Sequence, residues 1–439
     1  MPIKIEGFDK DLSANAGLIL YNRLFEKTNI SDSLSSAVPA LKGGVGRSLH
    51  KAKQIVLGLV SGADCLDDYD RLAHDGGFKA ICDEKVYSAK SCGDFLRSFN
   101  RLQIRTLNQK LVDNGFAMRE AVIGKTESFT IDLDSTSNPQ YGKKMEGVVT
   151  NYKGIDCLDT IHAFDEYGIQ YWNDVRPGST NTATGSLEII HEIFKKFPAT
   201  EDFKHMRKYF RADRGYCNIG ILNACAAKGV GFVIGLRQLM MNPLINRVNE
   251  WHREDPRKKD RIIFKGGREC EIGETVYQPK NSPHIFRVVI IRAPKNGRER
   301  QIVFGKDDYD YFGWVTSIGS NEMSARKVIH FYRKRGNAEN YIKDVKLGLD
   351  MQHYPCQKLN ANRAYALLGA FAYNMMRYFA LSADKKSPQQ AKAIRFRFVH
   401  LPCQVVRHAG EVVFRFMQKH LREVDYWLKR IEKLQLRFQ

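Results

Sequence analysis

One segment, residues 331–346, carries side chains that could bring a metal-binding acid up to a phosphodiester. Spaced at i, i+3, i+7 and i+14, and therefore on one face of a helix, these side chains are Tyr332, Arg335, Glu339 and Lys346. The arginine and lysine suit phosphate oxygens, and the tyrosine could hydrogen-bond to them or stack. Gly336 in mid-helix costs about 1 kcal/mol relative to alanine, which favours a close backbone approach there. The alternative interpretation is a solvated helix with an ion pair between Glu339 and Lys343.

Two aspartates upstream could complete a metal site. The run FTIDLD alternates as a strand does and places Asp132 and Asp134 on the same face, and the strand-like run MRKYFRAD ends at Asp213. Two-metal phosphoryl transfer requires carboxylates that converge on one point, and Mg²⁺ prefers such oxygen ligands. A single aspartate at a strand end is also typical of an ordinary turn. The joint arrangement with Glu339 in a basic chain favours the metal site.

The elements around these aspartates follow a recognisable order. Strands are expected near residues 128–134 and in a hairpin that turns at 166–168, and the next elements are a helix, a strand, a helix and a buried strand up to residue 237. This order is that of a ribonuclease-H-like mixed sheet in an α/β fold. In such a sheet the first and fourth strands are neighbours, so Asp134 and Asp213 should meet. Glu339 would then come from a helix packed on the sheet.

Changes between helix-like and strand-like sequence patterns divide the chain into five expected regions. Runs such as RIIFKG, HIFRVVIIRA and RQIVFG predict a β-rich insertion, whereas CGDFLRSFNRLQ predicts a capped helix with Arg97 and Arg101 on one side. Short helices with arginines fit a DNA-reading helix-turn-helix or an ordinary bundle equally well. The expected regions are a helical DNA-binding region 1–120, a first catalytic part 121–236, the insertion 237–318, a second catalytic part 319–385 and a basic helical region 386–439.

Composition restricts the class of partner. Among 439 residues, 69 are Lys or Arg and 49 are Asp or Glu, which gives a net charge of +20 and favours a nucleic acid as partner. The nine cysteines are odd in number and show no CxxC pair, so we expect reduced thiols, no zinc site and a cytoplasmic, nucleoid-associated protein. We find no signal peptide and no apolar run of the roughly 18 residues that a membrane span needs. Neither GxxxxGK[ST] nor GxGxxG is present.

The spacing Tyr332-xx-Arg335-xxx-Glu339-xxxxxx-Lys346 matches the YREK signature of DDE insertion-sequence transposases. Upstream, DLDSTSNPQYG and FRADRGY resemble the first- and second-aspartate segments of that family, and VRPGSTNT is similar to its Arg-Pro-Gly turn. The β-rich insertion before the glutamate also has a counterpart there. The resemblance covers about residues 125 to 380, and the four-residue signature is its most specific part.

This resemblance implies a ribonuclease-H-like catalytic domain that cleaves DNA and transfers strands. It implies that two Mg²⁺ ions, for which Mn²⁺ can substitute, are bound by Asp134, Asp213 and Glu339. It also implies that phosphates near the transposon end are held by Tyr332, Arg335 and Lys346. The implied partners are double-stranded DNA, as inverted-repeat ends and as target, and a second copy of the chain in a homodimer that cuts in trans.

Three further residues have less certain roles. In some relatives an aromatic side chain of the insertion stabilises a flipped base, and Trp314 or Trp251 could do so here, although core packing is the alternative for Trp314. Asp134 is preferred to Asp132 as the first ligand, because the family's aspartate is followed by x-Thr, as in Ser135-Thr136. Asp132 would then support a ligand or lie on the surface.

We therefore predict the transposase of a bacterial insertion sequence. One alternative is a ribonuclease-H-like nuclease, such as a junction-cutting enzyme, that hydrolyses DNA without strand transfer. The intact signature and the large insertion argue against it. The other alternative is a catalytically silent or domesticated DNA-binding protein, and the presence of all three carboxylates argues against it.

Overall fold

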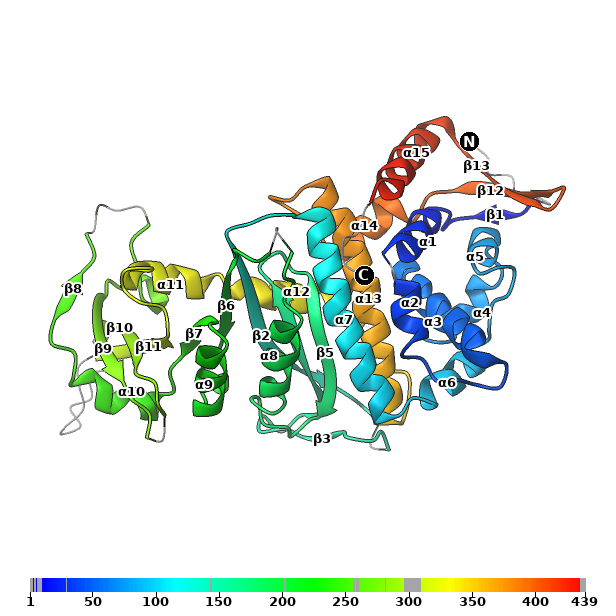
Figure 1. Ribbon diagram of the computed structural model, residues 1–439. Helices are drawn as coiled ribbons and strands as arrows, with labels where there is room; N and C mark the ends of the chain where they lie inside the picture. Colours follow the sequence, from blue (N-terminus) through cyan, green and yellow to red (C-terminus); the bar gives the residue numbers. More distant parts are fainter. Residues whose placement is uncertain are drawn as a thin grey trace.

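The computed structural model describes residues 10–28, 30–142, 144–200, 203–255, 257, 260–280, 282–295 and 309–434, together with Ile3 and Ile5. These residues form a mixed α/β protein with one ten-stranded sheet and one three-stranded sheet. The molecule is elongated, with the expected insertion at one end and the N-terminal helices at the other (Figure 1). No helix in the described ranges is long and apolar enough to cross a membrane.

Five strands form the centre of the large sheet: β2 (Ser128–Pro139), β4 (Asp156–Asp165), β5 (Gln170–Pro177), β6 (Arg207–Ala212) and β7 (Gly231–Gly235). Strand β4 pairs antiparallel with both β2 and β5, whereas β6 runs parallel to both β2 and β7. The hairpin between β4 and β5 turns at 166–168, as predicted, and Gly168 supplies the positive φ of 77° that the turn requires.

The predicted order of three strands, helix, strand, helix and strand is confirmed. The two helices are α8 (Ser186–Lys195) and α9 (Ile219–Ala227). The unpredicted elements among the described residues of this stretch are a short strand before β4, β3 (Val149–Thr150), and a 3₁₀ turn after β6 (Arg214–Tyr216). A parallel connection needs a crossover of this kind, because two parallel strands cannot be joined by a tight turn. The helices α8 and α9 lie on the crossovers that lead to β6 and β7.

Two long helices pack against the central strands, α7 (Arg101–Val122) and α13 (Leu359–Ala383). Helix α13 carries a long apolar run, and almost all of its side chains are buried. Helix α7 begins with a capping box, in which Asn100 accepts a hydrogen bond from Gln103 N at 2.9 Å. From α7 the ring of Phe116 lies 5.4 Å from the ring of Phe129 on β2. The alternating apolar side chains of β2 therefore face this helix.

The predicted helix over CGDFLRSFNRLQ is wrong in its extent. Helix α6 (Ala89–Arg97), capped by Ser88, ends before the cap at Asn100 starts α7. Arg97 and Arg101 consequently belong to different helices. The physical reason is local, because an asparagine that bonds the backbone three residues ahead starts a new helix and prevents the continuation of the old one.

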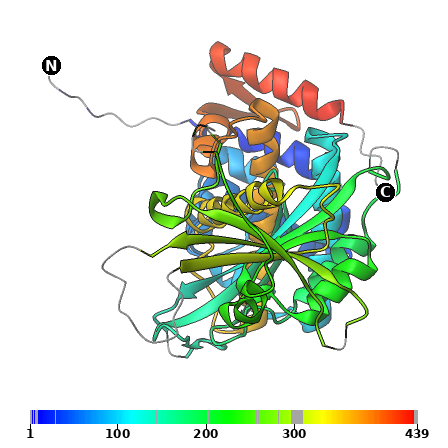
Figure 2. The ribbon, with the colours of Figure 1, turned by 90° about the vertical axis from the view of Figure 1, so that its left-hand side faces the viewer.

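The residues of the insertion continue the large sheet instead of building a sheet of their own. Strand β11 (Tyr309–Thr316) pairs antiparallel with β7, and the sheet then extends through β10 (Phe286–Pro294), β9 (Glu271–Tyr277) and β8 (Trp251–Arg253). Viewed from that end, these strands lie in front of the rest of the molecule (Figure 2). Helix α10 (Gln238–Ile245) packs against β9.

The three strand predictions within the insertion have different outcomes. The prediction for HIFRVVIIRA is confirmed by β10. The prediction for RIIFKG is wrong, because Ile263 forms only an isolated bridge with Glu269 and the 3₁₀ turn Lys265–Gly267 follows, with Gly266 at a φ of 78°. The run RQIVFG lies outside the described residues.

The segment 331–346 is not one helix. Helix α11 (Ala325–Arg333) ends before helix α12 (Gly336–Gly348) begins, and the junction closes with a tighter bond from Arg335 N to Tyr332 O at 2.8 Å. Gly336 therefore opens α12 instead of interrupting a helix. A Cβ at Gly336 would meet no atom within 4 Å, so the predicted close backbone approach is absent from the described chain.

The chain's two terminal regions meet, which the sequence did not reveal. Strand β1 (Leu12–Ser13) pairs with β12 (Cys403–His408), and β12 pairs with β13 (Glu411–Phe416). The other elements of these regions are α1 (Leu18–Lys27), α2 (Ile30–Ser35), α3 (Gly44–Ser61), α4 (Asp68–Leu72), α5 (Gly76–Ile81), α14 (Ala391–Phe398) and α15 (Gln418–Glu432). Ion pairs from Arg23 and Lys27 of α1 to Glu432 of α15 reinforce this contact.

A buried ion pair joins the two parallel strands at the centre of the sheet. Arg211 on β6 donates to both carboxylate oxygens of Asp132 on β2, each at 2.7 Å, and its side chain is only 2% exposed. The same guanidinium donates to Phe331 O at 2.6 Å and lies 4.7 Å from the Phe331 ring. Asp132 is therefore not a surface residue. With Arg211 it ties β2, β6 and α11 together.

This pair makes a prediction about stability. Replacing Arg211 by Met should lower the free energy of unfolding by about 3–5 kcal/mol, because Asp132 would remain buried without its partner. Arg207→Met is the matched control on the same strand, since Arg207 and its partner Glu127 are 54% and 91% exposed and the pair is worth little. Urea unfolding of both variants measures the difference. Equal losses would show that the buried pair adds nothing beyond a surface one.

Candidate active site

Asp134 and Asp213 lie side by side at the centre of the large sheet. Leu133 of β2 is in register with Ala212 of β6, so the residues that follow them, the two aspartates, stand at the same level of neighbouring strands. The strand order thus brings together two carboxylates that are far apart in the sequence. This part of the predicted arrangement is present in the structure.

Asp213 also has a role in a turn. Its carboxylate accepts a hydrogen bond from Gly215 N at 2.8 Å and so caps the 3₁₀ turn Arg214–Tyr216. The turn interpretation and the ligand interpretation are compatible, because an ionised carboxylate has two oxygens and about four sites that accept hydrogen bonds or cations. One oxygen can organise the turn while the carboxylate faces the cavity that it lines.

Arg335 connects the other two candidate ligands. One guanidinium nitrogen donates to Asp134 Oδ2 at 2.8 Å and another donates to Glu339 Oε1 at 3.0 Å. The Arg335 side chain is 13% exposed, whereas that of Glu339 is 65% exposed. The partner of Glu339 on the helix is thus Arg335, not the Lys343 of the alternative interpretation. In the described ranges no three His, Cys, Asp or Glu side chains form a preassembled metal site.

Two cavities involve Arg335 or its partners, since Arg335 lines the larger one and hydrogen-bonds to Asp134 and Glu339 in the lining of the smaller one. The larger, about 990 Å³, is lined by Asp213, Arg214, Trp314, Tyr332 and Arg335, among others. The smaller, about 370 Å³, is lined by Asp134, Ser135, Thr136, Glu339, Lys343 and Lys346, with two apolar neighbours. The candidate carboxylates are therefore divided between the two cavities.

The other two residues of the signature lie close by. Lys346 donates to Ser137 O at 3.1 Å and to Thr136 Oγ1 at 3.3 Å, which ties α12 to β2 just beyond Asp134. Burial lowers the pKa of Lys346. The Tyr332 ring lies 5.9 Å from the Arg335 guanidinium, and burial raises the pKa of its hydroxyl. Tyr332 thus lines the same cavity as Asp213, and Lys346 lines the same cavity as Asp134 and Glu339.

Trp314 and Trp251 occupy different environments. Trp314 is only 2% exposed and packs edge-on against Tyr332 with ring centroids 5.5 Å apart. The core-packing alternative therefore describes Trp314 in this conformation, and its ring has no exposed face on which a base could stack. Trp251 is partly exposed on β8, with the Arg292 guanidinium 4.2 Å from its ring centre.

Sequence reasoning missed Arg237, which lies just after β7. Its guanidinium donates to Gly215 O at 2.9 Å and to Arg214 O at 3.2 Å, and it thereby secures the turn that Asp213 caps. The signal was available, because β7 is the next parallel strand beside β6 and its end lies at the same edge of the sheet. The argument that paired Asp134 with Asp213 extends to this third strand.

The site holds negative charge in a poorly solvated position. Burial raises the pKa of Asp134 from the ordinary 3.8 to about 6, although Arg335 acts to lower it, and the charge of Asp213 adds to the rise. Carboxylate oxygens are the ligands that Mg²⁺ and Mn²⁺ prefer. A divalent cation here would stabilise the ionised carboxylate of Asp134, which burial and the charge of Asp213 disfavour. The donor set therefore fits such an ion.

The raised pKa of Asp134 predicts a pH-dependent effect of its replacement. Because its pKa is higher in the folded chain than the ordinary 3.8, ionisation disfavours the folded state as the pH rises through about 4 to 6. Asn cannot ionise. The stability of Asp134→Asn relative to wild type should therefore increase by about 2–3 kcal/mol between pH 4 and pH 8, as measured by urea unfolding in EDTA.

Asp94 on α6 provides a control of opposite sign. A hydrogen bond from Arg97 lowers the pKa of Asp94, so Asp94→Asn should become relatively less stable over the same rise in pH. If the Asp134→Asn difference did not change with pH, the charge of Asp134 would not be held in a poorly solvated site.

A comparison with models of protein families found a match. A family model described as "Transposase DDE domain group 1" matches residues 1–436, nearly the whole chain. No curated protein matches the sequence.

Proposed function

The chain belongs to the DDE transposase family, and on this basis we propose that it is the transposase of a bacterial insertion sequence. Membership of the family implies DNA as substrate and a role in DNA cleavage for transposition. The proposed activity is binding of the element's terminal inverted repeats, cleavage at the ends and transfer of the freed 3′ ends into target DNA. The observation that carries the proposal is the register that sets Asp134 beside Asp213, with Arg335 linking Asp134 to Glu339.

We assign the role of metal ligands to Asp134, Asp213 and Glu339. DDE transposases generally use divalent metal ions, and the all-oxygen donor set favours two Mg²⁺ ions, with Mn²⁺ as a substitute. When bound, such ions activate the attacking oxygen and stabilise the leaving oxygen of the phosphodiester. The arrangement of β4, β2, β6 and β7, with one antiparallel and two parallel pairings, supports the assignment of a ribonuclease-H-like catalytic core that continues through α12.

The remaining residues of the signature bind and orient the DNA. We assign phosphate contacts to Tyr332, Arg335 and Lys346, which border the carboxylates and support a place in the YREK group. Positioning and charge neutralisation are the main tasks of a protein in phosphoryl transfer, because the reaction leaves it little covalent chemistry. By hydrogen-bonding Ser137 O, Lys346 also fixes α12 relative to the strand that carries Asp134.

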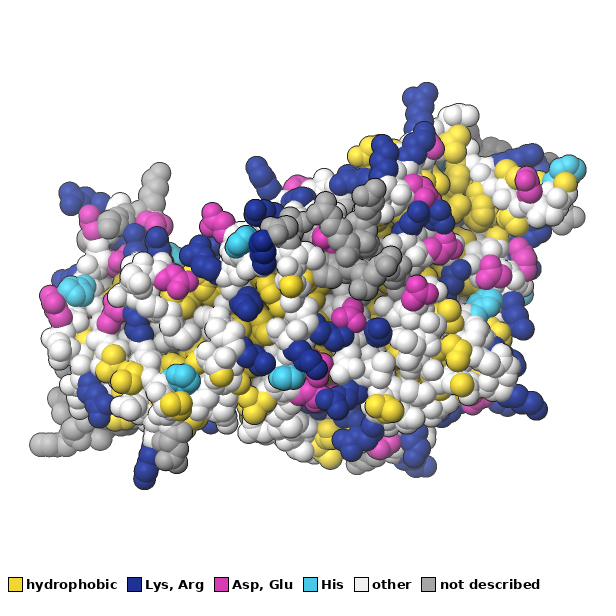
Figure 3. Space-filling model, in the orientation of Figure 1, with side chains coloured by type: hydrophobic (Ala, Val, Ile, Leu, Met, Phe, Trp, Pro, Cys, Tyr) yellow, Lys and Arg dark blue, Asp and Glu magenta, His cyan; other side chains and the backbone are white. Residues whose placement is uncertain are grey.

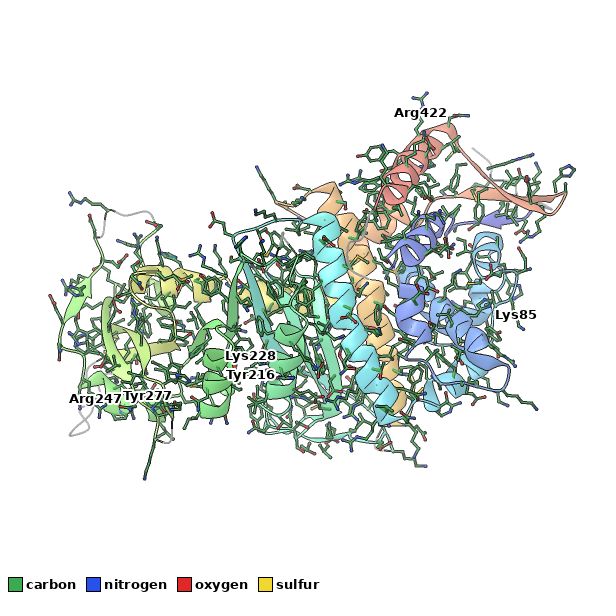
Figure 4. The ribbon with its side chains drawn as sticks, in the orientation of Figure 1. Lys85, Tyr216, Lys228, Arg247, Tyr277 and Arg422 are labelled. Atoms are coloured by element: carbon green, nitrogen blue, oxygen red, sulfur yellow. The ribbon has the colours of Figure 1, made fainter. Side chains whose placement is uncertain are left out.

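The charge distribution supports a long DNA partner. Lys and Arg side chains are spread along the whole visible face instead of gathering over one element (Figure 3). The labelled Arg247, Lys228, Lys85 and Arg422 lie along the length of the molecule, from the insertion to α15 (Figure 4). Many dispersed phosphate contacts suit two DNA ends held by a homodimer, with the helices of residues 1–120 as the proposed sequence-reading region. Binding should then weaken steeply with salt.

Cleavage of a linear DNA that carries the gene's flanking ends tests the proposal. Wild-type protein should cut at the end with Mg²⁺ and should not cut in EDTA. Asp213→Asn should bind the same DNA but reduce cutting to background, because one metal ligand is lost. Asp425→Asn, on the exposed face of α15, is the matched control and should cut as wild type does. Cutting that survives in Asp213→Asn would place the metal site elsewhere.

Glu339→Gln provides an independent test of the third ligand. End binding in a gel-shift assay should remain within about twofold of wild type, because Glu339 is exposed and contributes little to the fold, whereas cleavage should fall to background. Glu127→Gln is the control, at a site that is 91% exposed near the start of β2. Loss of end binding together with cleavage would mean that Glu339 serves the fold or the DNA contact and not the metal.

A further inference from the structure

The guanidinium of Arg335 occupies the centre of the carboxylate site. It donates to Asp134 at 2.8 Å and to Glu339 at 3.0 Å, and the charge of Asp213 acts on it as well. One protein cation thus interacts with all three candidate ligands. Arg335 and Asp213 line the larger cavity, whereas Asp134 and Glu339 line the smaller one.

Arg335 and a divalent ion would compete for the same atom. A metal ligand must offer a lone pair, and Asp134 Oδ2 is already engaged by the guanidinium at 2.8 Å. Glu339 Oε1 is engaged in the same way at 3.0 Å. Since the Arg335 side chain is mostly buried, its charge is poorly screened by solvent, and the repulsion of a second cation is correspondingly strong.

We propose that Arg335 is an internal cation that keeps metal affinity low until a DNA phosphate draws its guanidinium away from Asp134 and Glu339. This inference rests on the proposed metal site. Arginine suits the exchange, because its planar guanidinium binds phosphate in the same two-pronged manner as carboxylate. Its position also suits the exchange, since Arg335 lies at the junction of α11 and α12 and the space beside the neighbouring Gly336 is open.

The exchange couples the binding of metal to the binding of DNA. If phosphate releases the two carboxylates, DNA raises the affinity for metal, and by thermodynamic reciprocity metal raises the affinity for DNA by the same factor. A chain away from its element's ends would then hold few metal ions. Cleavage chemistry would be confined to the DNA-bound state without any movement of a domain.

Electron paramagnetic resonance of Mn²⁺ tests this coupling on the full-length protein. Without DNA, Arg335→Gln should bind Mn²⁺ more tightly than wild type by about tenfold, because the competing cation is removed. Lys343→Gln is the matched control. Lys343 lines the smaller cavity, and its replacement removes one positive charge, as Arg335→Gln does, without freeing Asp134. Lys343→Gln should bind Mn²⁺ within about twofold of wild type, because Lys343 is exposed and its charge is screened by solvent.

The second measurement repeats the Mn²⁺ titration in the presence of a DNA duplex that carries the gene's flanking end. The Mn²⁺ bound by the duplex alone is measured separately and subtracted. The duplex should tighten Mn²⁺ binding by wild type and by Lys343→Gln, but should have little effect on Arg335→Gln, in which the carboxylates are already free. Urea unfolding of each variant verifies that the fold is retained.

The outcomes separate this inference from the function on which it rests. If wild type and Arg335→Gln bind Mn²⁺ equally tightly, and Asp213→Asn loses that binding, the metal site is correct and the competition by Arg335 is overturned. If Mn²⁺ binds to none of the proteins, with or without the duplex, both the metal site and the competition are overturned. Tighter binding by Arg335→Gln alone, with the DNA effect lost, supports the competition.

Discussion

The parallel pairing of β2 with β6 is the interaction on which the rest of the site depends. It sets two aspartates, separated by most of a domain in sequence, at one level of the sheet. The buried pair of Asp132 and Arg211 joins the same two strands two residues before the two aspartates. The Arg211 guanidinium also donates a hydrogen bond to Phe331 O of α11. Because a shift of one residue between strands would turn the second aspartate to the opposite face, fixing this register is also fixing the chemistry.

Much of the catalytic half could be predicted from the sequence because its signals are local. Alternation defined β2, the turn at 166–168 defined the hairpin, and the apolar run defined α13. The conformation of Arg335 was beyond such reasoning. A spacing of three and four residues shows which side chains share a face of a helix. It does not show that the Arg335 guanidinium hydrogen-bonds to both Asp134 and Glu339 in the absence of phosphate. That outcome depends on β2, which is some two hundred residues away in the sequence.

The features that the sequence did not reveal have the same physical origin. Strand β11 joins β7, so the insertion widens an existing sheet, and the periodicity of a strand carries no information about its neighbour. Likewise, the division of 331–346 into α11 and α12 rests on tighter hydrogen bonds at their junction, such as that from Arg335 N to Tyr332 O. Patterns identify elements well. Which strands pair, and where a helix is interrupted, depends on contacts that the sequence pattern does not contain.

The small sheet in which β1 pairs with β12 has a consequence for synthesis on the ribosome. Leu12 and Ser13 are translated long before their partners, Gln404 and Cys403. The contact of α1 with α15 must wait longer still. The N-terminal helices therefore complete their packing only after the candidate carboxylates have been translated. Until β12 has been made, β1 lacks the strand with which it pairs.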